Sequence, residues 1–285
     1  MNEMQKTIRM PFSVKGVGLH TGRACEVKFL PAPPQSGIQF VRTDISYKPR
    51  FPAHVDYVVD IIRGTTLGQG EDRIYTIEHI LSALGGLGID NVVVELDDLE
   101  PPVGDGSAKD FVDAIFAVGT EEQDAPKSYF TVSKSYEYLS NQTLIRIEPH
   151  DQLEIMCEVA YQHPFFKTQQ FVYRSTDNYA TEIAPARTYC FDYEIEALKR
   201  KGLAKGGSLD NAIVIGPHGI YNPGSFLRFE NEFVRHKILD LMGDLMLLGS
   251  PLKARVLARR CGHGHNIKFL KQLLQEGRLL SPVSR

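Results

Sequence analysis

Hydrophobic and polar residues alternate with two different periods along the chain, and the period changes from place to place. Strict alternation predicts a half-buried strand, whereas apolar residues three and four apart predict a helix. In the first half these patterns predict a strand over Ala24–Leu30 and helices over Ile74–Leu84 and Ala108–Val118, and the short β-branched segment Ile89–Leu96 predicts a buried strand. The prolines of Pro31–Pro34 exclude both helix and central strand directly after the first strand. The first half is therefore predicted to mix strands with helices.

The polar segment Gly119–Lys127 shows neither period and predicts a linker between two domains, residues 1–118 and 128–285. Strands and then helices are predicted again beyond it. The predicted strands are Tyr129–Tyr138, Thr143–Ile147, Leu153–Val159, Phe171–Tyr173, Asn211–Ile215 and Leu252–Ala258, and the predicted helices are Asp192–Lys201, Asn231–Leu248 and Ile267–Gln275. Strands followed by helices in each half favour the α+β class over a doubly wound sheet. No repeat is visible in the sequence itself.

Composition narrows the class of protein. With 285 residues, 42% of them hydrophobic and 24% charged, the chain is long enough for two globular domains and is not a disordered or fibrous protein. A net charge of −3 gives no reason to expect a nucleic-acid partner. No apolar run approaches the roughly 18–20 residues of a transmembrane helix, and no signal peptide is visible. Cysteines without CxxC spacing predict reduced thiols, so we expect a cytoplasmic protein.

The strongest helical segment carries one row of polar residues, spaced four apart on an otherwise apolar helix: Glu232, His236, Asp240 and Asp244. A helix that is apolar on most sides is buried, and carboxylates on a buried helix need partners, a metal ion or a shifted pKa. The alternative is a solvated face on which His236 and Asp240 form an ordinary pair one turn apart.

His236 and Asp240 can bind one metal ion together, but a catalytic zinc site needs three protein ligands and an open position. His79 is the best remaining candidate. Thr76 is predicted to cap a helix, which places Glu78 and His79 in its first turn, and Glu78 would then act as a general base beside the metal. The HExxH spacing of common metallopeptidases is missing, which counts against that class.

A third feature is the segment Arg260–Asn266, in which glycines flank His263. Such glycines favour a loop where an imidazole can face a substrate, and His is suited to protonate a leaving nitrogen near neutral pH. Two alternatives stay open. The Cys261, His263 and His265 run could itself bind a metal ion, or the segment could be a glycine-rich turn with incidental histidines.

Six motifs in the same order resemble a single family over almost the whole chain. The motifs are Gly16–Gly22, Thr76–His79 continuing into Leu87–Asn91, Asp105–Ser107, Ala186–Thr188, Val234–Asp240 with Gly243 and Asp244, and Gly262 with His263. Together they resemble the zinc-dependent UDP-3-O-acyl-N-acetylglucosamine deacetylases (LpxC). Any one of these motifs alone would be a weak signal, whereas their order along the chain is specific.

The resemblance implies roles for the catalytic residues. Glu78 matches the family's general base and His263 its general acid. Asp244 would orient and charge His263, and Thr188 would donate a hydrogen bond to the oxyanion of the tetrahedral intermediate. The implied zinc ligands are His79, His236 and Asp240.

The resemblance also implies how the substrate is bound. Lys237 would meet the diphosphate, assisted by Arg260, where the family tends to carry Lys. Tyr161 aligns with an aromatic residue that stacks on uracil. The implied passage for the acyl chain is lined by Ile195, Ala204, Gly207 and Val214. His265 stands where the family pattern is apolar, which favours His263 over His265 for proton transfer.

The implied fold is two domains of similar topology, each a sheet with helices on one face, and the helices pack between the two sheets. The implied reaction is hydrolysis of the acetamide of UDP-3-O-(3-hydroxyacyl)-N-acetylglucosamine, a step of lipid A biosynthesis, by a zinc enzyme that we expect to be a monomer. The alternative is another zinc amidohydrolase with a different N-acyl substrate. The preferred acyl length, and iron in place of zinc, are left open.

Overall fold

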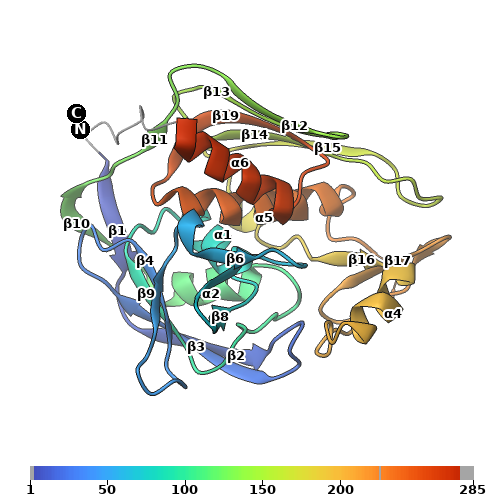
Figure 1. Cartoon of the computed structure of the whole chain (residues 1–285), viewed down its shortest axis with the longest axis horizontal. Helices are drawn as coiled ribbons and strands as arrows, with labels where there is room; N and C mark the ends of the chain where they lie inside the picture. Colours follow the sequence, from blue (N-terminus) through green and yellow to red (C-terminus); the bar gives the residue numbers. More distant parts are fainter. Residues whose placement is uncertain (1–2, 225, 277–285) are drawn as a thin grey trace.

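Two β-sheets face each other across a layer of helices, as Figure 1 shows. The structure, a computed structural model, describes residues 3–224 and 226–276. The helices between the sheets are α1 (Glu78–Gly86), α2 (Lys109–Val118), α5 (Glu232–Leu245) and α6 (His263–Glu276). Helices α1 and α5 pack directly against each other. Buried side chains from both halves therefore form one continuous hydrophobic core.

The two sheets have the same strand order and the same strand directions. The first runs β2-β3-β9-β4-β5 and the second β12-β13-β19-β14-β15, with a short additional strand, β11, beside β19. In each sheet the third and fourth strands are parallel and all other neighbours on this path are antiparallel. The predicted α+β fold of two similar sheet-and-helix units is confirmed.

The strands of the first sheet are β2 (Phe12–Val17), β3 (Ala24–Pro31), β4 (Ile38–Arg42), β5 (Arg50–Pro52) and β9 (Val92–Leu96). Those of the second are β11 (Phe130–Thr131), β12 (Tyr136–Ser140), β13 (Thr143–Pro149), β14 (Glu154–Val159), β15 (Gln169–Arg174) and β19 (Leu252–Arg259). The predicted alternation is confirmed in β3, where Cys25, Val27 and Phe29 are buried against the helices.

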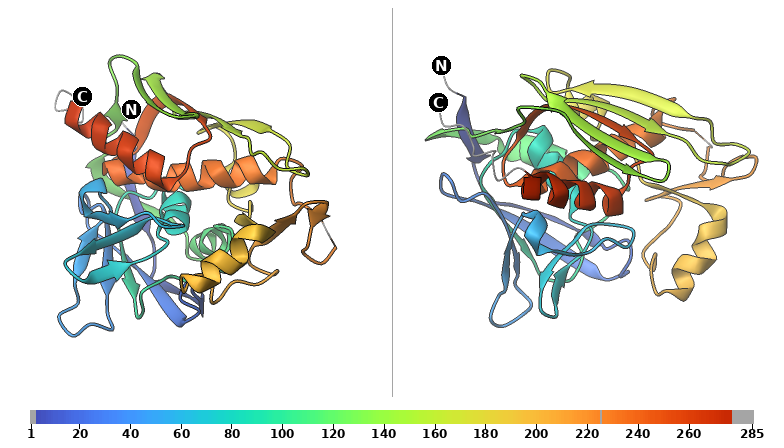
Figure 2. Two further views of the ribbon diagram at one scale, coloured as in Figure 1. Left: turned by 45° about the vertical axis from the view of Figure 1, so that its right-hand side comes forward. Right: turned by 45° about the horizontal axis from the view of Figure 1, so that its top comes forward.

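A small three-stranded sheet precedes the central helix of each half. In the first half it consists of β6 (Val58–Asp60), β7 (Thr66–Gln69) and β8 (Asp72–Ile74), after the short helix η1 (Val55–Tyr57). In the second half it consists of β16 (Tyr189–Phe191), β17 (Ile213–Gly216) and β18 (Gly219–Ile220), with α4 (Asp192–Arg200) inserted and α3 (Tyr179–Glu182) before it. Figure 2 shows that α4 and its strands project beyond the helical layer.

The structure differs locally from the expected elements at residues 119–127 and 260–266. Most of the segment 119–127, for which no regular element was expected, is a strand, β10 (Thr120–Pro126), which pairs antiparallel with β1 (Met4–Ile8), whereas its role as a linker between domains stays a prediction. Its sequence shows no alternation of hydrophobic and polar residues, because most of its side chains are at least partly exposed. The predicted loop over Arg260–Asn266 ends early, since α6 begins at His263.

The proposed division into domains stays a prediction, and its outermost residues, 1–2 and 277–285, lie outside the described part.

Helix α5 is followed by a single turn, η2 (Met246–Leu248). The four cysteines are free thiols. Within residues 3–224 and 226–276, no helix is both long and apolar enough to cross a membrane.

Candidate active site

The first turn of α1 is held in place by a buried carboxylate, Glu100. Thr76 has a positive φ of 52°, and its hydroxyl donates to Glu100 at 2.9 Å. The backbone N–H groups of His20 and Thr21 donate to the same carboxylate. The prediction that Thr76 caps the helix is therefore wrong: the cap residue is Ile77, without a side-chain hydrogen bond, because the Thr76 hydroxyl is already engaged. Glu78 and His79 nevertheless stand in the first turn, both buried.

The predicted polar row on α5 is buried throughout, which excludes the solvated alternative. Glu232, His236, Asp240 and Asp244 are at most 4% exposed. Each of the three carboxylates has a partner: Glu232 pairs with Arg187 at 2.8 Å, Asp240 pairs with Lys237 at 2.6 Å, and Asp244 accepts from the Thr65 hydroxyl at 2.6 Å. These partners satisfy charges that would otherwise be costly to bury.

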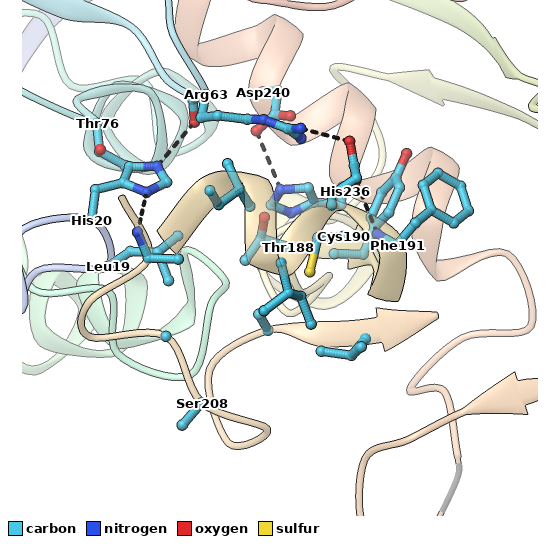
Figure 3. Close-up of a pocket in the computed structure, with 18 of the residues that line it drawn as sticks. Leu19, His20, Arg63, Thr76, Thr188, Cys190, Phe191, Ser208, His236 and Asp240 are labelled. Atoms are coloured by element: carbon cyan, nitrogen blue, oxygen red, sulfur yellow. Dashed lines mark hydrogen bonds and ion pairs between the residues drawn. The ribbon is translucent and has the colours of Figure 1, made fainter. Parts of the chain in front are cut away.

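His79, His236 and Asp240 meet where α1 crosses α5. One ligand atom from each lies within 4.8 Å of the others, the only such group in the described part of the chain. The Asp240 carboxylate lies 3.3 Å from His236 Nε2 and 3.7 Å from His79 Nε2. Figure 3 shows His236 and Asp240 pointing toward each other.

The chemistry of this donor set fits a cation. His236 Nδ1 lies 3.0 Å from the Ala186 carbonyl oxygen, which can only accept, so Nδ1 carries the proton and Nε2 presents a lone pair. Burial lowers the pKa of His79 to about 3, and burial also lowers the pKa of His236. Neutral imidazoles and an ionised carboxylate then direct lone pairs at one point, an arrangement that a metal ion stabilises.

Glu78, His263 and Asp244 form a second cluster beside the first. Asp244 Oδ2 lies 2.9 Å from His263 Nδ1, and His263 Nε2 lies 3.6 Å from Glu78 Oε1. Burial raises the pKa of Glu78 to about 7, against the opposing charge of His263. Burial by itself lowers the pKa of His263, but the charges of Asp244 and Glu78 raise it to about 10. A proton acceptor and a proton donor therefore stand side by side.

Thr188 is carried to the site by contacts between the two halves. Its N–H donates to the Gly106 carbonyl at 2.7 Å. The preceding residue, Arg187, donates through its N–H and its guanidinium to Glu232, the first residue of α5. Gly106 has a positive φ of 87°, and a Cβ there would stand 2.2 Å from the Asn211 carbonyl, so glycine permits this approach.

A cavity of about 440 Å³ opens from the two clusters toward α4 and β17. Its walls include all four residues predicted for the acyl passage, Ile195, Ala204, Gly207 and Val214, together with Tyr161, Thr188 and Lys237. Arg63 from the first half reaches across the cavity (Figure 3). It pairs with Glu194 of α4 at 2.6 Å. The cavity has apolar walls at one end and titratable groups at the other.

Two predicted or considered residues lie away from this cavity. Arg260 is exposed, is not among the residues that line the cavity, and donates to Gln142 on the turn between β12 and β13. His265 lies on α6 with its Nδ1 3.0 Å from the Tyr138 hydroxyl. The structure therefore brings His263, rather than His265, to the Glu78 cluster.

Sequence reasoning assigned no role to several residues that lie at the site. His20 and Arg63 line the cavity, and His20 Nε2 lies 3.3 Å from the Arg63 carbonyl oxygen. Thr65 contacts the Glu78 cluster. The glycines around His20, at positions 18 and 22, are a signal that could have identified it. Thr65 also has glycines nearby, at positions 64 and 68, but threonine is neither titratable nor a usual metal ligand, so its residue type gave no signal of a role at the site.

Comparison with known proteins agrees with the resemblance in the sequence. Residues 5–275 match the family described as UDP-3-O-acyl N-acetylglycosamine deacetylase. The UDP-3-O-acyl-N-acetylglucosamine deacetylases of Myxococcus xanthus and Cellvibrio japonicus are each 42% identical over 95% of this chain, and the matches span 87% and 90% of those proteins.

A bifunctional LpxC/FabZ enzyme of Chlorobaculum tepidum is also 42% identical over 94% of this chain. The match spans only 64% of that longer relative's length.

Proposed function

The chain belongs to the family of UDP-3-O-acyl-N-acetylglucosamine deacetylases, and from this premise we infer its reaction and propose which residues carry it out. It is a zinc-dependent hydrolase that removes the acetyl group of UDP-3-O-acyl-N-acetylglucosamine, a step of lipid A biosynthesis. The products are acetate and the free amine of the glucosamine. The observation that carries the proposal is the convergence of a metal-binding triad and a proton-transfer pair at the head of one cavity.

We propose that His79, His236 and Asp240 hold the zinc ion. When bound, zinc supplies a Lewis acid that polarises the amide carbonyl and makes water acidic enough to react near pH 7. The Ala186 carbonyl fixes the orientation of His236, and Lys237 balances the charge of Asp240. This environment supports neutral imidazoles at working pH.

Glu78 is proposed as the general base. Its raised pKa, about 7, suits a group that must accept a proton from water and later release it. The Thr65 N–H donates to Glu78 Oε2 at 2.9 Å, which leaves Oε1 on the side of His263. The carboxylate is therefore oriented before the substrate binds.

His263 is proposed as the general acid. Asp244 accepts the hydrogen bond from Nδ1, so Nε2 is the atom that can give a proton to the departing nitrogen. Thr188 lines the cavity with its backbone N–H already engaged, which leaves its hydroxyl to donate to the oxyanion. Each step uses a group already oriented by the fold.

The rest of the cavity suits an acylated nucleotide sugar. We propose that Ile195, Ala204, Gly207 and Val214 receive the acyl chain, because they line the apolar end. Tyr161 is 41% exposed at the mouth, where its ring can stack on uracil. Lys237 would contact the diphosphate. Because Arg260 is exposed, any contact that it makes with the substrate lies outside the cavity.

We further propose that the enzyme acts as a cytoplasmic monomer. All proposed site residues come from one chain, and free thiols are typical of a reducing compartment. Light scattering measures the molar mass of the purified protein and should give that of one chain. A dimer that loses its activity when it dissociates would contradict this proposal.

The decisive test is acetate release from UDP-3-O-acyl-N-acetylglucosamine. We expect turnover that a chelator abolishes and added zinc restores. UDP-N-acetylglucosamine without the acyl chain is the matched substrate and should be turned over poorly, because it leaves the apolar passage empty. Equal rates on simple acetamides would favour a different zinc amidohydrolase, and chelator-resistant turnover would overturn the metal assignment.

A further inference from the structure

Thr65 touches both partners of the proposed proton transfer without facing the cavity. It lies directly before β7, is fully buried and belongs to the first half of the chain. Its N–H donates to Glu78 Oε2 at 2.9 Å, and its carbonyl accepts from the Ile77 N–H at 3.2 Å. The backbone of Thr65 is thereby fixed to the first turn of α1.

The side chain of Thr65 turns toward the other half of the molecule. Its hydroxyl oxygen lies 2.6 Å from Asp244 Oδ1 and 3.1 Å from His263 Nδ1. An ionised carboxylate can only accept, so the hydroxyl donates to Asp244 and offers a lone pair to the Nδ1 proton of His263. The other oxygen of Asp244 accepts from His263 and from Asn266 Nδ2, at 2.9 and 2.8 Å. Both oxygens of Asp244 are therefore held.

We propose that Thr65 is a positioning residue for deacetylation, which aligns the Glu78 carboxylate through its amide and the Asp244–His263 pair through its hydroxyl. This inference rests on the proposed function. Glu78 comes from α1, Asp244 from α5 and His263 from α6, and Thr65 is in hydrogen-bond contact with all three. Loss of the hydroxyl leaves Asp244 Oδ1 without this donor and lets the imidazole turn away from the line of proton transfer.

The test replaces only the hydroxyl. Thr65→Val keeps the shape and the backbone contact to Glu78, and Thr65→Ser keeps the hydroxyl. We expect Thr65→Val to lower kcat about 10- to 100-fold, with KM and bound zinc unchanged, whereas Thr65→Ser stays within about threefold of the wild type. Thr66→Val is the matched control, because Thr66 is the next buried threonine and makes none of these contacts.

A double-mutant cycle separates positioning from a structural role. In a His263→Ala background, Thr65→Val should lower kcat by less than about threefold, because the group that it positions is gone. The full loss in both backgrounds, or a Thr65→Val enzyme with wild-type kcat, overturns the proposal. Wild-type protein that releases no acetate from the nucleotide sugar would instead refute the proposed function, so the two failures are distinguishable.

Discussion

Glu78 combines structural contacts with the proposed chemical role of a general base. Its carboxylate is buried and accepts the Thr65 N–H, as a structural residue would. Burial, together with the charges of Asp240 and Asp244, nevertheless raises its pKa to about 7 against the opposing charge of His263. A carboxylate in this environment exchanges protons at neutral pH, which an exposed glutamate does not do efficiently.

Replacing Glu78 should therefore separate proton transfer from metal binding. We expect Glu78→Gln to lower kcat about 10²- to 10⁴-fold, the usual contribution of a general base, while bound zinc stays at the wild-type level. His79→Ala should lose the metal as well as the activity. Acetate release and elemental analysis measure the two effects, and a Glu78→Gln enzyme of wild-type rate would show that another group is the base.

The two histidines of α6 provide an internal comparison. His263 contacts Asp244 and Thr65, whereas His265, two residues later, contacts Tyr138. We expect His263→Ala to lower kcat about 10²- to 10⁴-fold and His265→Ala to leave it unchanged. Steady-state kinetics of both variants measure these effects. A large loss of kcat in His265→Ala with little change in His263→Ala would identify His265 as the general acid instead.

At this scale the sequence predicted which residues of one helix share a face, but not the contacts between distant segments. The four-residue spacing on α5 identified His236, Asp240 and Asp244 because helical geometry alone places them on one face. Thr65 and Glu100 could not be identified in that way, since their contacts join segments 179 and 80 residues apart. Arg260 was assigned by resemblance, and no local pattern shows that its side chain turns to Gln142.

Among the elements, the two central helices determine where the site forms. Each begins with a buried glutamate that accepts a backbone N–H from a residue just before a strand of the small sheet: Glu78 from Thr65, before β7, and Glu232 from Arg187, before β16. The helices also approach closely, because a Cβ on Gly243 of α5 would stand 2.2 Å from the Glu78 carbonyl oxygen. The spacing of α1 and α5 thus controls the position of the proposed base.

Gly243→Ala should disturb both stability and catalysis. Alanine stabilises a helix by about 1 kcal/mol relative to glycine, whereas overpacking destabilises a protein by typically about 1–3 kcal/mol. The overpacking effect should dominate here, because the new methyl group would meet the rigid backbone of α1. We expect a lower free energy of unfolding in urea and a lower kcat. Gly219→Ala is the control, because a Cβ there meets nothing within 4 Å. An unchanged kcat in Gly243→Ala would mean that α1 accommodates the methyl group without moving Glu78.

Elements with strong periodicity were predicted well, and those defined by distant pairing were not. Helix α5 and strand β3 fall within a few residues of their predicted bounds. β10 was missed because its strand character comes from hydrogen bonds to β1, more than 110 residues earlier, and not from an apolar face. The shared topology of the halves was implied by resemblance alone, since their sequences show no visible repeat.

For the whole molecule, the important property is that polar contacts join the two halves around the site. Arg228 pairs with Asp105 at 2.7 Å, Arg63 with Glu194 at 2.6 Å, and Thr188 donates to Gly106. Asp105 also accepts from the N–H and hydroxyl of Ser107. Burial by itself raises the pKa of Asp105, but the hydrogen bonds of Ser107 and the charge of Arg228 lower it below its usual value.

This lowered pKa makes the Asp105 contribution to stability depend on pH. A carboxyl group whose pKa is lower in the folded state stabilises it above the unfolded pKa, about 3.9, and loses that effect as the pH falls through the folded value. We expect Asp105→Asn to cost about 1–2 kcal/mol at pH 7, a difference that shrinks below about pH 4.

Urea unfolding of chelator-treated protein from pH 7 to pH 3.5 measures this difference without a contribution from metal release. Asp113→Asn is the control, because its pair with Lys109 is exposed and contributes little. A difference between Asp105→Asn and wild type that stays constant over the whole range would assign the effect to packing instead of charge.

The repeated architecture holds a single candidate metal site in the described part of the chain. The second residue of α1 is His79, and its topological counterpart, the second residue of α5, is Phe233, which packs against the rings of Phe166 and Tyr189. The doubling of the architecture therefore does not double the number of reaction centres. One equivalent of zinc should saturate each chain, and inhibitor titrations should reach their end point at one molecule per polypeptide.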